Sequence, residues 1–325
     1  MADYIELGRS GIKISAIGVG TWQWGSESWG YGREYGKEDL REAFENALEL
    51  GVNFFDTAEI YGGGWSERLL GEFMRDRREE VVVATKLWPS RMTRGMMWKA
   101  LNRSLERLGT NYVDLYQLHW PNPLIPVSKY MRVMEEMWME GKVRAIGVSN
   151  LGLRQLEEAR TALSYTDIAS NQVKFNMLER DVERELLPYC QKEGITLIAY
   201  SPLAQGLLTG KYSPGKRPKD MVRRINKLFT TEYLRNVRPL LMVLGEIAER
   251  RGRTIAQVAL NWLISKPWVS AIPGAKHGRH VREAAGAMGW RLDEEELRKI
   301  DEALSLVKPN KVKVLFQSLA LLLKP

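Results

Sequence analysis

The sequence has very little cysteine and histidine. Its single cysteine, Cys190, excludes a disulfide framework and any zinc site built from several cysteines. Two of its three histidines stand in one short stretch, so we expect no metal site. The N-terminal residues are acidic and polar before they turn apolar, which is the wrong order for a secretion signal. With one thiol and no such signal, we expect a reducing, cytoplasmic compartment.

Long apolar runs and blocks of one charge are also missing. A membrane-spanning helix needs about 18 to 20 apolar residues, and the best candidate, residues 312–323, is shorter and contains Lys313, Gln317 and Ser318. The net charge of +8 could suit nucleic acid, but charges of both signs mix in segments such as residues 75–80. No nucleic-acid-binding motif accompanies them. We therefore expect neither a membrane segment nor a nucleic-acid partner, and the sequence does not indicate the oligomeric state.

The sequence does contain short β-branched runs that alternate with longer helical patterns, which is typical of parallel β/α units. Eight runs are expected to form strands: residues 14–20, 52–56, 81–86, 113–119, 143–148, 168–173, 195–200 and 268–272. The first seven recur about every 25 to 40 residues, the spacing of one strand, one helix and their loops. Helical periodicity is clearest at residues 37–50, 93–108, 133–139 and 254–264.

Eight such units predict an α/β fold, a (β/α)8 TIM barrel that forms one domain over residues 1–325. A doubly wound open sheet is the alternative, but the segment after the first strand, GTWQWG, lacks its GxGxxG spacing. We expect an N-terminal β-hairpin at residues 4–15 that could plug one mouth of the barrel. A long loop and helix at residues 201–242 would be inserted between strands seven and eight, and residues 307–325 would form a C-terminal tail.

Four ionisable side chains follow the ends of three neighbouring strands. Asp56 ends the second strand, Tyr61 lies five residues further on, Lys86 ends the third strand and His119 ends the fourth. Catalytic groups of a barrel sit at the C-terminal ends of its strands, so these four, the tetrad, would converge on one rim. Taken singly, each could instead be a cap, a solvent-exposed charge or a core residue.

The tetrad suits general acid catalysis. A tyrosine with its ordinary pKa near 10 is a poor acid at neutral pH, but a Lys86 ammonium would lower the pKa of Tyr61. Asp56 would keep Lys86 charged and oriented, and His119 could direct a substrate carbonyl oxygen or share its proton. No nucleophile is needed if a cofactor delivers a hydride.

Several segments in order along the chain resemble the aldo-keto reductase family. They are NFFDTAEIYGGGWSERLLGE at residues 53–72, VVVATK at 81–86, VDLYQLHWP at 113–121, GKVRAIGVSN at 141–150, ASNQVKFN at 169–176, IAYSPLAQGLLTGKY at 198–212 and AIPGAK at 271–276. The resemblance covers nearly the whole chain, from about residue 4 to about residue 306. It implies hydride transfer from a nicotinamide cofactor to an aldehyde or ketone without a metal, with Tyr61 protonating the developing alkoxide.

The resemblance also implies a cofactor site, residue by residue. The residues implied are Gly20, Thr21, Trp22 and Asp56 near the nicotinamide and ribose; Ser149, Asn150 and Gln172 on the carboxamide; Tyr200 stacked on the ring; and Ser201, Leu203, Gln205 and Lys211 in the loop around the pyrophosphate. After the eighth strand they are Pro273, Gly274, Lys276, Arg279, His280 and Glu283. Many family members place a Lys-Ser pair directly after Ile-Pro and an Arg at the position of His280, so this chain departs from the 2′-phosphate pattern. The resemblance implies NADP(H), with NAD(H) left open.

An aromatic pocket for a small carbonyl substrate is expected at the same rim. Its residues would be Trp22, Trp24, Trp29, Tyr61, Trp88, His119 and Trp120. Apolar walls with one polar corner suit hydrophobic or aromatic aldehydes. A cofactor-binding regulatory subunit similar to the channel β-subunits is the alternative, because those subunits keep the tetrad. We expect the enzyme, because no extended segment precedes the hairpin.

Overall fold

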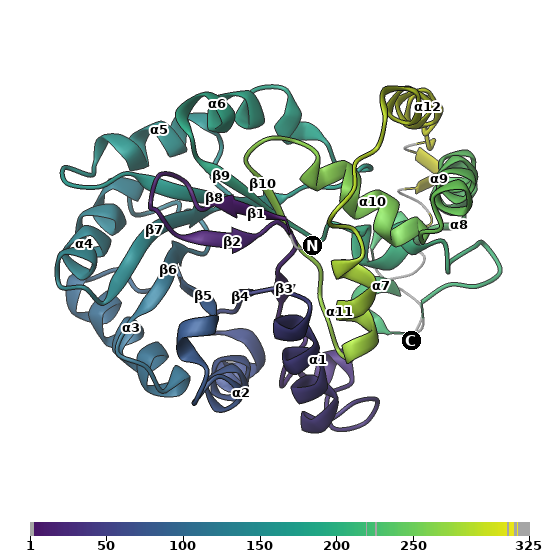
Figure 1. Cartoon of the computed structure of the whole chain (residues 1–325). Coiled ribbons are helices and arrows are strands. Elements are labelled where there is room, and N and C mark those ends of the chain that lie inside the picture. Colours follow the sequence, from purple (N-terminus) through teal and green to yellow (C-terminus); the bar gives the residue numbers. More distant parts are fainter. Residues whose placement is uncertain (1–2, 219, 225, 311, 315–316, 318–325) are drawn as a thin grey trace.

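A barrel of eight parallel strands forms the centre of the computed structural model, which describes residues 3–218, 220–224, 226–310, 312–314 and 317 (Figure 1). The strands pair in chain order: β3 (Val19–Gly20), β4 (Phe54–Asp56), β5 (Val82–Leu87), β6 (Val113–Leu118), β7 (Val143–Ser149), β8 (Ile168–Lys174), β9 (Thr196–Tyr200) and β10 (Val269–Ile272). Every pairing between neighbours is parallel, as the β/α alternation requires. The predicted (β/α)8 barrel is therefore confirmed.

The barrel closes between its first and last strands. Isolated bridges join Ile17 to Ala271 and Gly20 to Gly274, and Gly18 N donates to the Ala271 carbonyl at 2.9 Å. The prediction of one strand over residues 14–20 is wrong, because the start of this segment pairs in the N-terminal hairpin and its end pairs in the barrel. A hydrogen bond of 2.7 Å from Ser15 Oγ to the Ile17 carbonyl lies at the bend between the hairpin strand β2 (Lys13–Ser15) and β3.

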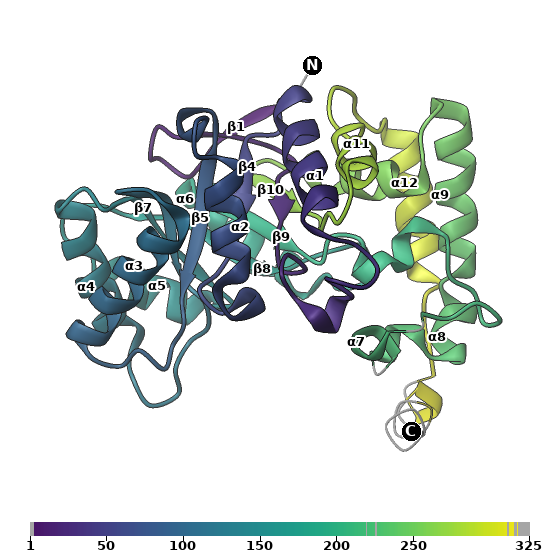
Figure 2. The same cartoon turned by 90° about the horizontal axis from the view of Figure 1, so that it is seen from below.

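Helices surround the strands (Figures 1 and 2). They are α1 (Lys37–Glu49), α2 (Trp65–Phe73), α3 (Arg94–Leu108), α4 (Val127–Met139), α5 (Leu153–Thr161), α6 (Leu186–Glu193), α9 (Arg238–Arg251), α10 (Ile255–Ile264), α11 (Gly278–Ala285) and α12 (Glu294–Ser305). Local signals set their ends. Thr93 caps α3 through Met96 N, and Thr254 and Gln257 form a capping box on α10. The expected helix at residues 133–139 begins earlier, at Val127.

The hairpin of β1 (Tyr4–Glu6) and β2 closes the N-terminal end of the barrel. Its apolar side chains Leu7, Ile12 and Ile14 are buried with the residues of the barrel interior, which include Phe54, Val82, Ala84, Leu115, Ala145, Ala169, Ile198 and Ile272. Gly8 N donates to Thr196 Oγ1 at 2.8 Å, which ties the turn to β9. With one mouth plugged, the C-terminal rim is the open end.

The segment between β9 and β10 contains short helices as well as α9 and α10. These are η5 (Ala204–Thr209), α7 (Met221–Arg224), η6 (Lys227–Phe229) and α8 (Thr231–Asn236). In the tail, Glu232 N of α8 donates to Gln317 Oε1 at 3.0 Å, and Asn310 N donates to Glu232 Oε1 at 3.3 Å. Most of the expected tail, at residues 311, 315–316 and 318–325, lies outside the described residues. In the part of the chain that the structure describes, no helix has both the length and the apolar character that a membrane crossing requires.

Candidate active site

The four residues of the tetrad lie together at the C-terminal rim of the barrel. Lys86 Nζ donates to Asp56 Oδ1 at 2.5 Å, to the Thr57 carbonyl at 2.8 Å and to the Tyr61 hydroxyl at 3.3 Å. The His119 ring packs edge-on against the Tyr61 ring, with centroids 5.7 Å apart. The structure thus brings a phenol, an ammonium, a carboxylate and an imidazole into contact range.

The Asp56 carboxylate of β4 accepts hydrogen bonds from side chains of three other strands. Its Oδ2 accepts from Gln117 Nε2 of β6 at 3.1 Å and from Gln172 Nε2 of β8 at 2.7 Å, while its Oδ1 accepts from Lys86 of β5. All four side chains are buried. Because a buried carboxylate is costly unless it is paired and hydrogen-bonded, these donors hold Asp56 in one position.

A chain of hydrogen bonds connects Asp56 to the residues predicted to hold the carboxamide. Ser149 Oγ donates to the Gln172 carbonyl at 2.8 Å, and Asn150 Nδ2 donates to Ser149 Oγ at 3.0 Å. The Tyr200 hydroxyl then donates to Asn150 Oδ1 at 3.0 Å. Asn150 has a left-handed backbone with φ 61°, a conformation that persists only where its surroundings enforce it. Groups that both donate and accept therefore line the rim beside the tetrad.

Burial and charge act in opposite directions on Tyr61 and Lys86. Burial raises the pKa of Tyr61 and the Lys86 ammonium lowers it, with a net pKa above the ordinary value. The prediction of a lowered Tyr61 pKa is therefore wrong for this structure, because loss of solvent outweighs the ammonium. Burial alone would lower the pKa of Lys86, but Asp56 and Tyr61 more than offset it and raise the pKa. Lys86 is therefore charged and Tyr61 protonated at neutral pH.

His119 is a neutral imidazole at physiological pH. Burial, with the nearby Lys86 ammonium, lowers its pKa to about 2. Its Nδ1 is buried and has no hydrogen-bond partner among the described residues. A ring that stays neutral can orient a carbonyl oxygen but does not carry a second proton for it.

Three of the predicted pocket tryptophans stand at the rim. Trp22 and Trp120 are exposed and Trp88 is partly buried. The Trp22 ring lies 6.5 Å from the Tyr61 ring, and the Trp88 ring lies 5.2 Å from the His119 ring, both measured between centroids. Trp22 and Trp88 therefore flank the tetrad.

The other two predicted pocket tryptophans lie deeper. Trp24 has no exposed surface, its Nε1 donates to the Ala275 carbonyl at 2.8 Å, and its ring packs against Phe55 and Phe73. The prediction that Trp24 contacts substrate is therefore wrong, because the loop after β3 turns this ring into the core. Trp29, in η1 (Glu27–Trp29), is buried and packs edge-on against Trp22, so it supports that ring.

The loop after β9, here called the belt loop (residues 201–212), has an unusual backbone. Ser201, Ala204 and Gln205 all adopt positive φ, at 51°, 48° and 55°. Residues other than glycine rarely take this conformation, and clusters of them mark functional sites. Of the predicted contacts here, Ser201, Leu203 and Gln205 are partly buried and Lys211 is exposed.

Cations gather where the belt loop meets the end of β10. The charges of Arg223 and Arg279 both act on Lys211, and those of Arg223 and Lys211 act on Lys276. Lys276 Nζ also donates to the Trp29 carbonyl at 2.5 Å, which ties η1 to the loop after β10. Carboxylates lie among these cations, because Arg223 pairs with Asp220 at 2.6 Å and the charges of Glu283 and Glu34 act on Lys211 and Lys276 respectively. Lys211, Lys276 and Arg279 are therefore the cations that suit phosphate groups.

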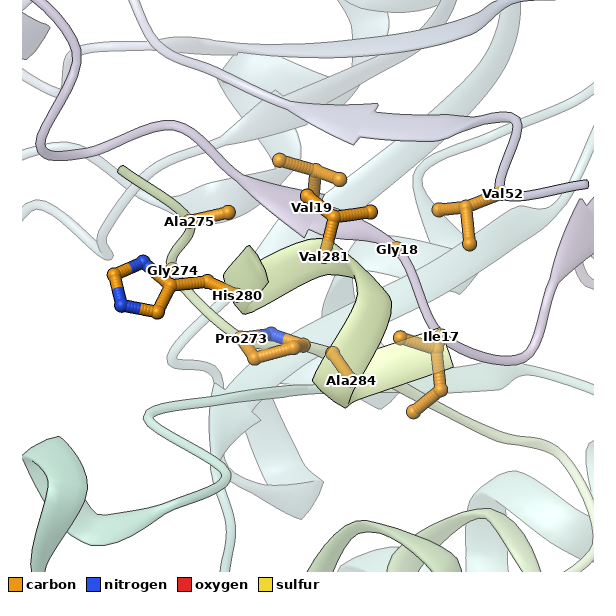
Figure 3. A pocket seen from close by; sticks show the side chains of 10 residues that line it. All are labelled: Ile17, Gly18, Val19, Val52, Pro273, Gly274, Ala275, His280, Val281 and Ala284. Carbon is orange, nitrogen blue, oxygen red and sulfur yellow. The ribbon is translucent and has the colours of Figure 1, made fainter. Parts of the chain in front are cut away.

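The predicted contacts after β10 surround the start of α11. Lys276 N donates to His280 Nδ1 at 3.2 Å, and burial, with neighbouring cations, lowers the pKa of His280 to about 4. A small cavity of about 10 Å³ lies between this helix and the strands, lined by Ile17, Gly18, Val19, Val52, Pro273, Gly274, Ala275, His280, Val281 and Ala284 (Figure 3). It has room for roughly one water and none for a nucleotide. Arg279 is exposed and Glu283 partly buried.

The first-strand loop is supported from below by hydroxyl groups. Thr21 Oγ1 donates to the Asp56 carbonyl at 2.9 Å and lies 2.7 Å from Ser66 Oγ. Thr21 has no exposed surface, so the predicted cofactor contact is not available to its side chain. Gly20 lies where a Cβ would come within 2.9 Å of the Ile272 carbonyl, so glycine lets this loop meet the last strand closely.

Sequence reasoning missed two groups that contact the tetrad, the Gln117 amide and the Thr57 carbonyl, and one carboxylate that does not contact it, that of Glu59. Gln117 had a usable signal, because it stands two residues before His119 and strand side chains alternate between faces. Glu59 accepts from Trp88 N at 2.8 Å, and nothing in its spacing to Trp88 indicates that contact.

Comparisons with known proteins agree with this geometry. The model of the Aldo/keto reductase family matches residues 16–305, and the chain belongs to that family.

Among the described residues, no group of three or more histidine, cysteine, aspartate or glutamate side chains could hold a metal ion.

Similar proteins include named reductases. An uncharacterized oxidoreductase of Mycobacterium tuberculosis is 42% identical over 306 residues, which is 94% of each chain. The chloroplastic pyridoxal reductase of Arabidopsis thaliana is 39% identical, over 94% of this chain and 88% of that protein. The crystal structure of an aldo-keto reductase from Klebsiella pneumoniae in complex with NADPH is 30% identical, with a TM-score of 0.77 over 96% of this chain and 98% of that one.

Proposed function

We propose that this protein is an NADP(H)-dependent oxidoreductase that reduces aldehydes or ketones to alcohols, with Tyr61 as the general acid. One observation carries the proposal: the buried Lys86 ammonium bonds to both the Asp56 carboxylate and the Tyr61 hydroxyl at the open rim. A phenol fixed beside a permanent cation can give up its proton to a developing alkoxide, because the ammonium stabilises the phenolate left behind.

The residues of the rim fit a nicotinamide dinucleotide. Ser149, Asn150 and Gln172 offer the donors and acceptors that a carboxamide needs, and Tyr200 provides a ring beside them. The cations at Lys211 and Arg279 suit its phosphates, whereas Arg223 is paired with Asp220. When bound, the cofactor supplies the hydride.

The substrate would be held by the remaining groups of the rim. The neutral His119 orients the carbonyl oxygen toward the Tyr61 hydroxyl. The rings of Trp22 and Trp88 line the two sides of the pocket. Tyr61 then donates its proton to that oxygen. Lys86 and Asp56 are buried and paired with each other, so the charge that Tyr61 needs remains in place.

Replacement of the proton donor tests this proposal. We expect wild-type protein to oxidise NADPH in the presence of 4-nitrobenzaldehyde, and Tyr61→Phe to lower kcat by about 10²- to 10⁴-fold, the usual contribution of a general acid. NADPH binding, followed by fluorescence titration, should stay close to wild type, because the phenylalanine ring keeps the packing against His119. Turnover that is unaffected by the substitution would refute the role of Tyr61.

A cofactor-binding regulatory subunit is the second candidate. It is favoured by relatives that include a putative voltage-gated potassium channel subunit beta of Schizosaccharomyces pombe, which is 35% identical over 92% of this chain and 92% of that protein. The same assay separates the two functions. Tight NADPH binding with negligible turnover of several aldehydes by the wild-type protein would indicate the regulatory subunit.

A further inference from the structure

Glu59 is a buried carboxylate within the active-site loop that the tetrad does not use. It stands between Asp56 and Tyr61, and its side chain is only 7% exposed. Its Oε1 accepts from the backbone N of Trp88 at 2.8 Å, and its Oε2 accepts from Arg91 Nη2 at 3.1 Å. Burial of a carboxylate is unfavourable unless its oxygens are satisfied, and these two contacts satisfy one oxygen each.

Trp88 is therefore fixed at its backbone by the neighbouring loop. It comes directly after β5, and its ring lies edge-on to His119 with an interplanar angle of 86°. The next residue, Pro89, is held from the other side, because its carbonyl accepts from Asn122 Nδ2 at 2.8 Å and from the Tyr130 hydroxyl at 2.5 Å. The segment 88–89 is thus anchored toward the loop after β4 by Glu59, toward the loop after β6 by Asn122 and toward α4 by Tyr130.

We infer that Glu59 is a positioning residue that fixes the Trp88 wall and thereby sets which carbonyl substrates the pocket favours. The inference rests on the proposed function. A planar aromatic aldehyde that lies against the Trp88 ring benefits from a wall that is ordered before binding. A small aliphatic aldehyde has too little surface to use that wall, so its turnover depends on the tetrad alone.

The Arg91 contact is separable from the Trp88 contact. The Arg91 side chain is 36% exposed, so its ion pair with Glu59 is partly solvated and contributes little by itself. A glutamine at position 59 keeps an oxygen for Trp88 N but loses the ion pair. The proposal therefore assigns the effect to the bond with Trp88 N, and Arg91→Met is the matched control.

The experiment compares kcat and KM for 4-nitrobenzaldehyde and for propanal. For Glu59→Ala we expect KM for 4-nitrobenzaldehyde to rise on the order of tenfold, since small misplacements of positioning groups have effects of this size or larger. The kcat/KM for propanal should stay within about twofold of wild type, as should the Kd for NADPH. Glu59→Gln and Arg91→Met should keep the wild-type ratio between the two substrates.

Two further variants keep the inference testable if Glu59→Ala folds poorly. Asn122→Ala removes a donor from the Pro89 carbonyl and should shift the substrate ratio in the same direction. In Trp88→Ala protein, the additional change Glu59→Ala should have no further effect on the ratio. Equal losses for both aldehydes, or a Glu59 effect that persists without Trp88, would overturn the inference. Failure of the wild-type protein to reduce either aldehyde would instead overturn the proposed function.

Discussion

Burial and the Lys86 charge act in opposite directions on the pKa of Tyr61. Burial favours the neutral phenol, while the ammonium at 3.3 Å favours the phenolate, and the net effect is a pKa above the ordinary value of Tyr61. A raised pKa keeps the acid form present across the physiological range. His119 does not titrate in that range, because burial lowers its pKa to about 2.

The pH dependence of carbonyl reduction follows from these directions. Tyr61 must be protonated to act as an acid, so activity is present below its pKa and lost as the pH rises through it. We expect kcat/KM for an aldehyde to be flat from about pH 6 to pH 9 and to fall only near or above pH 10, the ordinary pKa of tyrosine. Initial rates at saturating NADPH measure this. An alkaline decline centred near pH 7 would show that the Tyr61 pKa is lowered in the working enzyme.

The sequence predicted these residues unequally well. Asp56, Lys86 and His119 end apolar strands, so the barrel rule alone places them at one rim. The burial that raises the pKa of Tyr61 depends on the loops above it, which no periodicity reveals. Trp24 was misplaced for the same reason, because its neighbours Phe55, Phe73 and Ala275 come from distant segments.

Among the elements, the strands after the first and the helices α1, α3 and α10 were predicted closely, and the connections were not. Apolar periodicity and caps such as Thr254 locate α10 within a residue. By contrast, the positive φ values at Ser201, Ala204 and Gln205 occur at residues that have no special preference for that conformation. Their backbone is imposed by contacts such as the 3.1 Å bond from Asn176 Nδ2 to the Ser201 carbonyl, which sequence patterns do not encode.

The hairpin turn provides a test at the level of an element. Gly8 and Gly11 both have positive φ, but a Cβ at Gly8 would lie 2.5 Å from the Ala169 carbonyl oxygen, whereas at Gly11 it would meet nothing within 4 Å. Gly11→Ala should lower the free energy of unfolding by only about 1–2 kcal/mol, the cost of a left-handed backbone at a residue other than glycine. Gly8→Ala should cost about 1–3 kcal/mol more, because the turn must move off the barrel interior. Urea unfolding of both variants measures the difference, and equal costs would show that the hairpin does not seat as tightly as described.

For the whole molecule, the charge distribution bears on the choice of cofactor. The chain carries a net charge of +8, and Lys211, Lys276 and Arg279 lie near the end of β10, where Arg223 is already paired with Asp220. A dinucleotide with an additional 2′-phosphate would gain more from this field than one without it. That gain should weaken as salt screens the exposed charges.

Thermal unfolding tests the preference. A ligand at 100 times its Kd raises the free energy of unfolding by about 2.7 kcal/mol. We expect NADPH to raise Tm more than NADH at the same concentration, and the difference to shrink between about 50 and 500 mM NaCl because the Debye length shortens. ADP-ribose lacks both the nicotinamide and the 2′-phosphate and serves as a control for binding through the pyrophosphate alone. Equal shifts with NADPH and NADH at low salt would argue against a 2′-phosphate site.

The thin closure between β3 and β10 has a consequence for how occupancy could be observed. The two ends of the sheet meet through a few backbone bonds, among them Gly18 N to Ala271 O and Gly20 N to Pro273 O. A nucleotide that contacts both Gly20 and Gly274 would link the two strands and stabilise the hydrogen bonds between them. The amide protons of Gly18 and Gly20 should then exchange with solvent more slowly in the bound protein, so their exchange rates report binding at the point where the barrel closes.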